Sequence, residues 1–448
     1  MDKITQVLIL LVLLNLNSWS WASQDSLNFE QEKSFNEIVL KEIELSRFNL
    51  LFNYENHRQS NWLPYRYFAG QEASAAGVNA GLIVGLVARE EHLNDPAKIH
   101  PVTLEYSLMP QMIGQFVGGI EPVYELFLKT KKFYNLKTKN IIPKIAIKHV
   151  NNLNNELNSL GQELNLKNSN LIQLQEVNVQ KTLQHALISQ YNQFHLQTKA
   201  FNIFQNSMFV MDSLKNTTGA LGNLIGIISV HDRNPKINGP AFLLTTLSGV
   251  LIILGPIVSR VNRVIVKTIV KNQLKEREVI DFQNNLNQFN NNLNSLIVMV
   301  AKHPQDKSIN QSLKSRLTFY KQQQFLLQGD LNKIIKQNEK NKRLAHIQIP
   351  IATIVGSTKI ALGVCGMVAG FKYYRHPQEA QTLVADGSIP FICGTGIAMV
   401  DNLRFLTISQ IDYFKNKKIN NLPSMTYTNY LNDLDKIETS VKANIRSN

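Results

Sequence analysis

Histidine and acidic residues recur in three short polar segments, and such side chains together can bind zinc, iron or manganese. The candidate ligands are His92, His231 and His376, accompanied by His100, Asp95, Asp232 and Glu379. No His-x-x-His pair fixes a ligand geometry, and an arginine stands near the histidine in every segment. Arginine and histidine also occur where a protein meets water and lipid headgroups. We therefore expect no metal site and no cofactor, and the three histidines are the positions to test.

Catalytic motifs are missing from the sequence. It has no Walker-type phosphate loop, no His-Glu-x-x-His, no Gly-x-Ser-x-Gly and no Cys-x-x-Cys. Gly394-Thr395-Gly396 lacks the preceding strand that a dinucleotide-binding loop needs, and it lies in an apolar segment. The sequence therefore predicts a protein that is not an enzyme.

The charge balance points to a membrane. The 448 residues include 47 Lys and Arg against 33 Asp and Glu, which gives a formal net charge of +14. No signature of a folded nucleic-acid-binding module accompanies this excess. Much of it lies beside apolar segments, where basic side chains attract anionic headgroups, although ordinary solvated helix surface is an alternative. The expected partner is a lipid bilayer, with anionic lipids as a further candidate, and not nucleic acid.

Glycines spaced three or four residues apart mark three apolar segments. Such a stripe on one helix face lets a second backbone approach closely. In a soluble helix each glycine would cost roughly 1 kcal/mol relative to alanine, so a packing role in a membrane is the favoured interpretation. The predicted helix-packing residues are Gly77, Gly81, Gly85, Gly219, Gly222, Gly226, Gly363, Gly366 and Gly370.

The glycine-rich segments recur at intervals of about 140 residues, as the positions of Gly81, Gly222 and Gly366 show. Each runs into a polar loop with Arg, His and Pro, and a second apolar segment follows. This order predicts an internal repeat of a helical membrane hairpin. A span needs about 20 apolar residues, which 240–258 and 349–371 approach or reach. The first hairpin is shorter and fits either a span or a re-entrant segment.

Apolar residues between the hairpins follow a heptad pattern. Phe282, Leu286, Phe289, Leu293 and Leu296 are spaced four, three, four and three residues apart, and a similar stripe resumes after Pro304. A 3.5-residue period predicts helices that wind around one another. No strand signal of useful length occurs. The predicted fold class is all-α: an integral membrane protein with three glycine-rich hairpins alternating with long antiparallel coiled-coil hairpins.

The N-terminus has the pattern of an export signal. Lys3 precedes an apolar core at 4–14, and Ser20-Trp21-Ala22 fits a cut before Ser23. The predicted segments are a signal peptide (1–22), an N-terminal helical arm (23–72), membrane hairpin 1 (73–121), coiled helical hairpin A (122–215), membrane hairpin 2 (216–260), coiled helical hairpin B (261–345), membrane hairpin 3 (346–401) and a C-terminal helical hairpin (402–448).

Two signals disagree about topology. Export places the coiled segments outside the cytoplasm, in a periplasm or lumen. Basic residues crowd the coil-side ends of the hairpins, and Lys and Arg near a span usually stay in the cytoplasm. We follow the export signal, because long segments can translocate regardless of their charge.

Two functions are compatible with this architecture. The first is a non-enzymatic, membrane-anchored scaffold or tether that organises a membrane or a membrane complex, through homo-oligomers or a coiled-coil partner. The alternative is an oligomeric pore or transport component built from the glycine-rich hairpins. Transport pathways usually contain charged residues. The apolar segments are read as nearly free of charge, with Asn79, Asn223 and Asp386 as the polar exceptions, and this favours the scaffold.

The two cysteines flank the apex of the third predicted hairpin. Cys365 and Cys393 are equidistant from residue 379, just past Pro377. Antiparallel helices place residues equidistant from the turn at equal depth. The sequence therefore predicts two unpaired, buried thiols at one level of the membrane.

Overall fold

The computed structural model of the chain describes residues 3–58, 62–94, 101–164, 170–275, 281–302, 311–418 and 423–447. Within these ranges it contains ten α-helices, one short 3-10 helix and no strand, which confirms the predicted all-α fold. The predicted signal peptide (1–22) lies outside the part of the chain whose side chains are described, so it stays a prediction.

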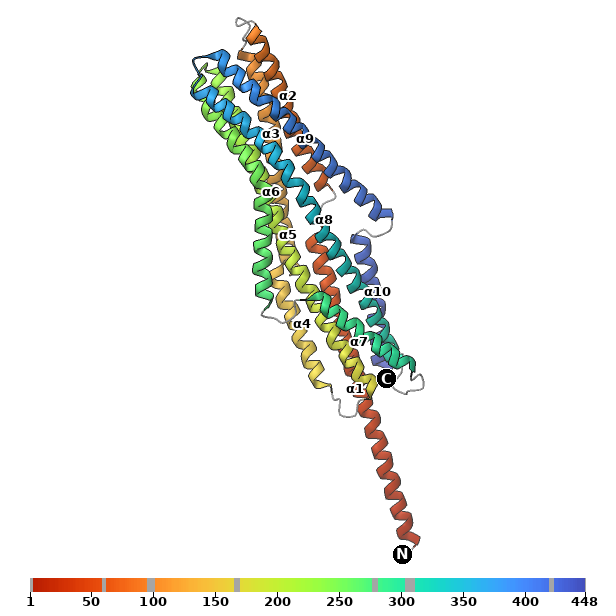
Figure 1. Cartoon of the computed structure of the whole chain (residues 1–448). Coiled ribbons are helices and arrows are strands. Elements are labelled where there is room, and N and C mark those ends of the chain that lie inside the picture. The colour runs from red at the N-terminus through yellow and green to blue at the C-terminus, as the bar shows by residue number, and fades with distance from the viewer. Residues whose placement is uncertain are drawn as a thin grey trace.

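The helices form an elongated molecule with two ends (Figure 1). In chain order they are α1 (Lys3–His57), α2 (Leu63–Asn94), α3 (Pro101–Thr138), α4 (Pro143–Glu163), α5 (Leu171–His231), η2 (Pro235–Ile237), α6 (Asn238–Lys275), α7 (Phe282–Lys302), α8 (Gln311–Phe371), α9 (Pro377–Lys418) and α10 (Pro423–Ser447). We call one end the ring: α2, α3, α6, α9, residues 203–231 of α5 and 346–371 of α8. The other end is the stalk: α1, α4, α7, α10 and the first parts of α5 and α8.

Two helices run through both ends. α5 and α8 have 61 residues each, and each is roughly 90 Å long. They cross the boundaries predicted at 215/216 and 345/346 without interruption. The segments predicted as coiled hairpins and as membrane hairpins therefore share continuous helices.

The ring helices form a closed circuit of contacts. α2 packs against α3, α3 against α5, α5 against α6, α6 against α8, α8 against α9, and α9 against α2. The chain reverses direction at every hairpin, so each helix runs antiparallel to both of its neighbours. A single chain thus closes the ring.

The outer surface of the ring is apolar. Three of its helices are long and apolar enough to cross a membrane: Pro235–Leu274, His346–Phe371 and Pro377–Lys418. Only 22% to 33% of the residues in their most apolar stretches are buried, so the rest are at least partly exposed. α2, α3 and α5 expose large apolar residues too, among them Ile83, Val87, Ile113, Phe116, Leu221 and Ile228. A soluble protein rarely exposes so continuous an apolar surface, which indicates membrane association.

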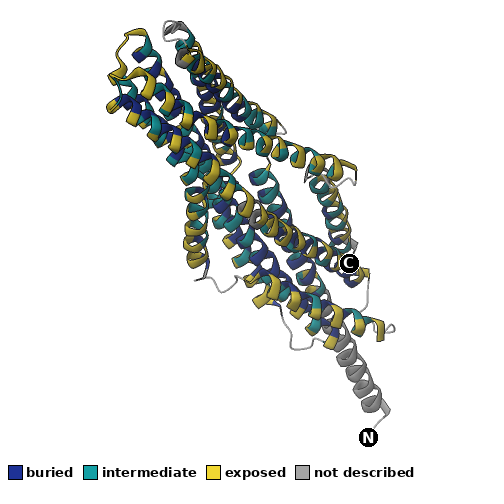
Figure 2. Ribbon diagram, turned by 45° about the horizontal axis from the view of Figure 1, so that its top comes forward, coloured by how far each residue is buried: buried dark blue, intermediate teal, exposed yellow. Residues whose placement is uncertain are grey.

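The stalk is built around three helices that run side by side towards the ring, α1, α5 and α8. Each shorter helix fits between two of them: α4 contacts α1 and α5, α7 contacts α5 and α8, and α10 contacts α8 and α1. The heptad residues of α7 are at most 4% exposed. The helices therefore do not pair only within separate hairpins, and α10 packs on the central helices. Figure 2 shows the buried residues on the inner helix faces.

Candidate functional site

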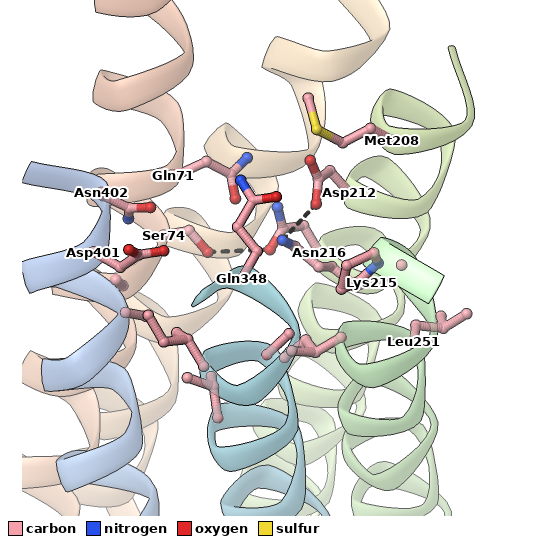
Figure 3. A pocket seen from close by; sticks show the side chains of 18 of the residues that line it. Gln71, Ser74, Met208, Asp212, Lys215, Asn216, Leu251, Gln348, Asp401 and Asn402 are labelled. Carbon is pink, nitrogen blue, oxygen red and sulfur yellow. Dashed lines mark hydrogen bonds and ion pairs between the residues drawn. The ribbon is translucent and has the colours of Figure 1, made fainter. Parts of the chain in front are cut away.

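A cavity of about 220 Å³ lies inside the ring, and all six ring helices contribute residues to its wall. We call it the chamber. Its lining combines apolar side chains with polar and charged ones. Figure 3 shows the polar side chains of several helices around it, including Gln71, Ser74, Asp212, Lys215, Asn216, Gln348, Asp401 and Asn402. Buried polar groups need partners, so their contacts define what the chamber can hold.

Asp212 of α5 is held by two partners. Its Oδ1 lies 2.6 Å from the Lys215 ammonium, one helical turn further along α5. The hydroxyl of Tyr67, on α2, donates to its Oδ2 at 2.6 Å. The charges of Asp212 and Lys215 therefore compensate each other at the stalk side of the chamber.

Lys359 of α8 lines the chamber and is only 4% exposed. Its ammonium donates to Ser248 Oγ of α6 at 2.7 Å, and Ser248 in turn donates to the Lys215 carbonyl oxygen. The Phe391 ring centre lies 5.7 Å from the ammonium. In the described part of the chain no carboxylate forms an ion pair with Lys359. This lysine is therefore a buried cation with a neutral hydroxyl and an aromatic face as its neighbours.

Amide side chains complete the wall. Ser74 Oγ donates to Asn216 Oδ1 at 3.2 Å, whereas Asn216 Nδ2 finds no partner among the described residues although Asn216 is 5% exposed. Asn223 Nδ2 donates to Gln115 Oε1 at 3.5 Å. The amide nitrogen of Asn216 is thus buried without an acceptor among the described residues.

Gly219 makes room for the chamber wall. A Cβ atom at this position would collide with Gln115 Oε1 of α3 and would lie 3.0 Å from the Lys359 ammonium. A side chain here would therefore displace one or both polar groups. The glycine lets α3 and α8 bring them to the surface of α5.

An apolar cluster fills the ring at the end away from the stalk, where the helices of each hairpin are connected (the hairpin tips). Its buried members are Val78, Leu82, Leu362, Ala369, Val384 and Phe391. The chamber therefore lies between this cluster and the stalk.

The nine predicted packing glycines all lie at contacts between ring helices. A Cβ at Gly77 would be 2.5 Å from the Pro110 carbonyl of α3, and one at Gly222 would be 2.8 Å from the Ala241 carbonyl of α6. Three glycines of α8 meet the preceding hairpin rather than their own: Gly363 faces Thr246, Gly366 faces Phe242, and Gly370 faces Gly239. Gly81 and Gly85 face Ser107, and Gly226 faces Leu108.

The histidine candidates lie at the hairpin tips, away from the chamber. His231 is exposed, with Nδ1 3.5 Å from Glu105 Oε1, and the His376 amide donates to the Tyr373 carbonyl at 2.8 Å. The side chain of His92, and His100 and Asp95 entirely, lie outside the described residues. Among the described side chains no three metal-binding groups come together.

Sequence reasoning overlooks Lys359, although it lies in the apolar segment 349–371. One signal could have found it, because it follows Gly356 by three residues and precedes Gly363 by four, which places it on the glycine face of the helix. Of the three polar exceptions, Asn79 accepts a hydrogen bond from Thr395, Asn223 contacts Gln115, and Asp386 is exposed.

The chain matches no protein-family model, and neither a curated protein nor a solved structure is significantly similar to it. Its function must be argued from its own geometry.

Proposed function

We propose that this protein is a membrane transport or channel component that takes a small polar solute into the chamber. The observation that carries the proposal is a chamber lined in part by polar and charged side chains and bordered by six helices whose outer faces expose apolar residues. Ionisable residues inside a membrane are expensive and usually belong to a pathway or a binding site. Because one chain closes the ring, transport needs no oligomer.

All three hairpins span the membrane in this proposal. In the sequence, the apolar segments of the first hairpin are shorter than those of the other two. Its α3 nevertheless exposes apolar side chains from Tyr106 to Phe127, a rise of roughly 32 Å. This matches the hydrocarbon thickness of about 30 Å. The contacts of α2 and α3 with the apolar helices favour a span over a re-entrant hairpin.

The internal repeat supports a ring with approximate threefold symmetry. α3 and α6 have 38 residues and α9 has 42, whereas α4 and α7 have 21 and α10 has 25. α5 and α8 are equally long. In the first repeat, α1 followed by α2 takes the position that α5 and α8 take in the other two. Each repeat would supply a long helix, a returning helix and a short one. The chamber would lie on the common axis.

Contacts in the stalk agree with this repeat. Glu176 and Arg316 are 140 residues apart and form an ion pair, and Gln190 and Asp330 have the same separation and a hydrogen bond. Asn49 and Gln190 are 141 apart and also bonded. Residues at equivalent places in the three repeats therefore meet each other, as they would around a threefold axis.

A scaffold or tether that organises a membrane complex is the second candidate. The stalk extends well beyond the ring and exposes apolar residues such as Phe325 and Leu171. Such a surface would suit a second copy or a coiled-coil partner. Anionic lipids would meet the basic residues at the stalk side of the ring, among them Arg260, Arg263 and Lys267.

The stalk lies outside the cytoplasm in this proposal, as the export signal favours. A fusion of alkaline phosphatase at Pro304, outside the described residues, should be active, and a cytoplasm-only fluorescent reporter at the same site should be dark. The reverse pattern would place the stalk in the cytoplasm.

Solute flux tests the transport function. Full-length protein in sealed liposomes should speed the entry of at least one small solute from a panel of cations, anions and neutral polar molecules, followed by stopped-flow light scattering. The Ala352→Trp variant fills the chamber and should return the rate to that of empty liposomes. Leu254→Trp, on the outer face, is the matched control and should behave like the wild type. Flux equal to that of empty liposomes for every solute would contradict the proposal and favour the scaffold.

A further inference from the structure

We propose that the solute bound in the chamber is a small monovalent anion and that the Lys359 ammonium is its counter-charge. This inference rests on the proposed function and names the class of solute. It begins from the charged residues that line the chamber: Asp212, Lys215, Arg260, Lys359 and Asp401.

The carboxylates of the chamber are already paired. Asp212 lies 2.6 Å from Lys215, and Asp401 lies 2.6 Å from Arg404. Arg260 reaches Gln348 Oε1 at 3.4 Å. Lys359 remains, in the described part of the chain, with no carboxylate partner. The chamber wall therefore carries positive charge that the protein itself does not compensate at Lys359.

The hydrogen-bonding groups favour an acceptor as the ligand. An ammonium has three donors, and Lys359 uses one of them on Ser248 Oγ. Asn216 Nδ2 also lacks a partner among the described residues, but it packs against Gly118 of α3 and has almost no accessible surface. Both residues are more than nine-tenths buried and line the same chamber. An anion would accept from the Lys359 ammonium and would compensate the buried charge, which is costly when unpaired.

The size of the chamber limits the ligand. Its volume of about 220 Å³ is below the 300–1,000 Å³ typical of sites for drug-sized molecules. A water molecule takes about 30 Å³ of liquid, so a handful of waters would fill the space. Halides, nitrate and small carboxylates such as acetate fit, alone or with some of their hydration water. One uncompensated ammonium matches a single negative charge.

Binding can be measured on the full-length protein in detergent. Its thermal unfolding midpoint is recorded against chloride, iodide, nitrate and acetate, with gluconate keeping the ionic strength constant. We expect a saturable rise with the small anions. Lys359→Gln should weaken the apparent affinity at least tenfold, and Lys359→Arg should largely restore it. Lys236→Gln, at an exposed hairpin tip, is the matched control and should leave the affinity unchanged.

A second variant keeps the test sharp if Lys359→Gln does not fold. Asn216→Asp hardly changes the volume but adds a fixed negative charge to the chamber, so it should abolish the anion effect. Iodide entry into liposomes that contain a halide-sensitive dye should fall in the same variants.

The outcomes separate the two proposals. Binding and flux of a cation or neutral solute, unaffected by Lys359→Gln, would overturn the anion inference and leave the transport function standing. An anion effect that persists in both Lys359→Gln and Asn216→Asp would also overturn it. If no solute of any charge binds or moves, the transport function fails as well.

Discussion

The ring and the stalk share the helices α5 and α8, but apolar side chains are buried in the stalk and exposed in the ring. On the stalk part of α5, Leu183 and Leu187 are buried, whereas on the ring part Leu221 and Leu224 are exposed and Asn223 is buried. The surroundings explain the reversal, because water favours buried apolar residues and a bilayer removes that preference. This reversal is expected of a helix that passes from water into a bilayer.

The buried cations of the stalk and the ring differ in their carboxylate partners. Arg316 in the stalk is fully buried and pairs with Glu176 and Glu32 at 2.6 and 2.8 Å. Burial alone would lower the pKa of Arg316, but the two carboxylates raise it above its usual value. Lys359 in the ring has no such partners. The charge of Arg316 is thus compensated within the protein, whereas that of Lys359, next to a cavity, is available to a ligand.

The largest effect is expected from breaking the ion pair in the stalk. Glu176→Gln combined with Glu32→Gln leaves Arg316 buried with neither carboxylate partner and should lower the free energy of unfolding by about 3–5 kcal/mol. Urea unfolding, followed by circular dichroism, measures the change. Glu156→Gln removes the exposed pair with Lys41 and is the control, with about 1 kcal/mol or less. Equal effects of the two variants would show that the buried ion pair contributes no more to stability than the exposed one.

Asp330 should make stalk stability depend on pH. Burial raises its pKa to about 6 from the ordinary 3.8, and Gln190 donates to its Oδ2 at 2.7 Å. The protonated form is favoured in the folded state, so its stabilising contribution is complete below about pH 4 and is lost as pH rises through 6. The loss is about 3 kcal/mol at most. Asp330→Asn should remove this component from the pH profile of unfolding. A profile identical to that of the wild type would show that Asp330 titrates normally.

Overpacking the ring should have a smaller effect per site. Gly366→Leu would push into the Phe242 ring and Gly222→Leu into the Ala241 carbonyl, at about 1–3 kcal/mol each. We expect the double variant to accumulate less in the membrane and to be more sensitive to protease. Gly396→Leu should accumulate normally, because a Cβ at this position would have no atom within 4 Å. Normal levels of the double variant would mean that the glycine contacts are incidental.

Sequence patterns predicted the helices well, because periodicity is a local property. The heptad residues of α7, such as Leu286 and Phe289, are fully buried. The continuity of α5 and α8 was not predictable in the same way, since the apolar face moves around the helix with no break in helix-forming sequence. Ring closure depends on contacts between residues hundreds of positions apart, which periodicity does not report.

The relative depth of the two cysteines along the third hairpin depends on where the turn between α8 and α9 lies. Cys365 lies beside Gly387, where a Cβ would be 3.1 Å from the Cys365 Cβ, and Gly394 meets Thr358. Cys393 therefore lies roughly 9 Å further along α9 than the level of Cys365. The prediction of equal depth is wrong, because α8 ends at Phe371 and the apex comes before Pro377. Cys365 is half-buried and Cys393 is exposed, so the two thiols are not buried as the sequence predicts.

Accessibility of single cysteines tests most directly whether the ring encloses a solvated chamber within the membrane. In a background with Cys365→Ala and Cys393→Ala, Ser74→Cys places a thiol in the chamber and Leu254→Cys places one on the outer face. Membrane-impermeant thiol reagents should label the Ser74→Cys variant at least tenfold faster, and Ala352→Trp should slow that labelling. If Ser74→Cys is as unreactive as Leu254→Cys, while Leu171→Cys in the stalk reacts fully, the ring encloses no solvated chamber and the account is contradicted.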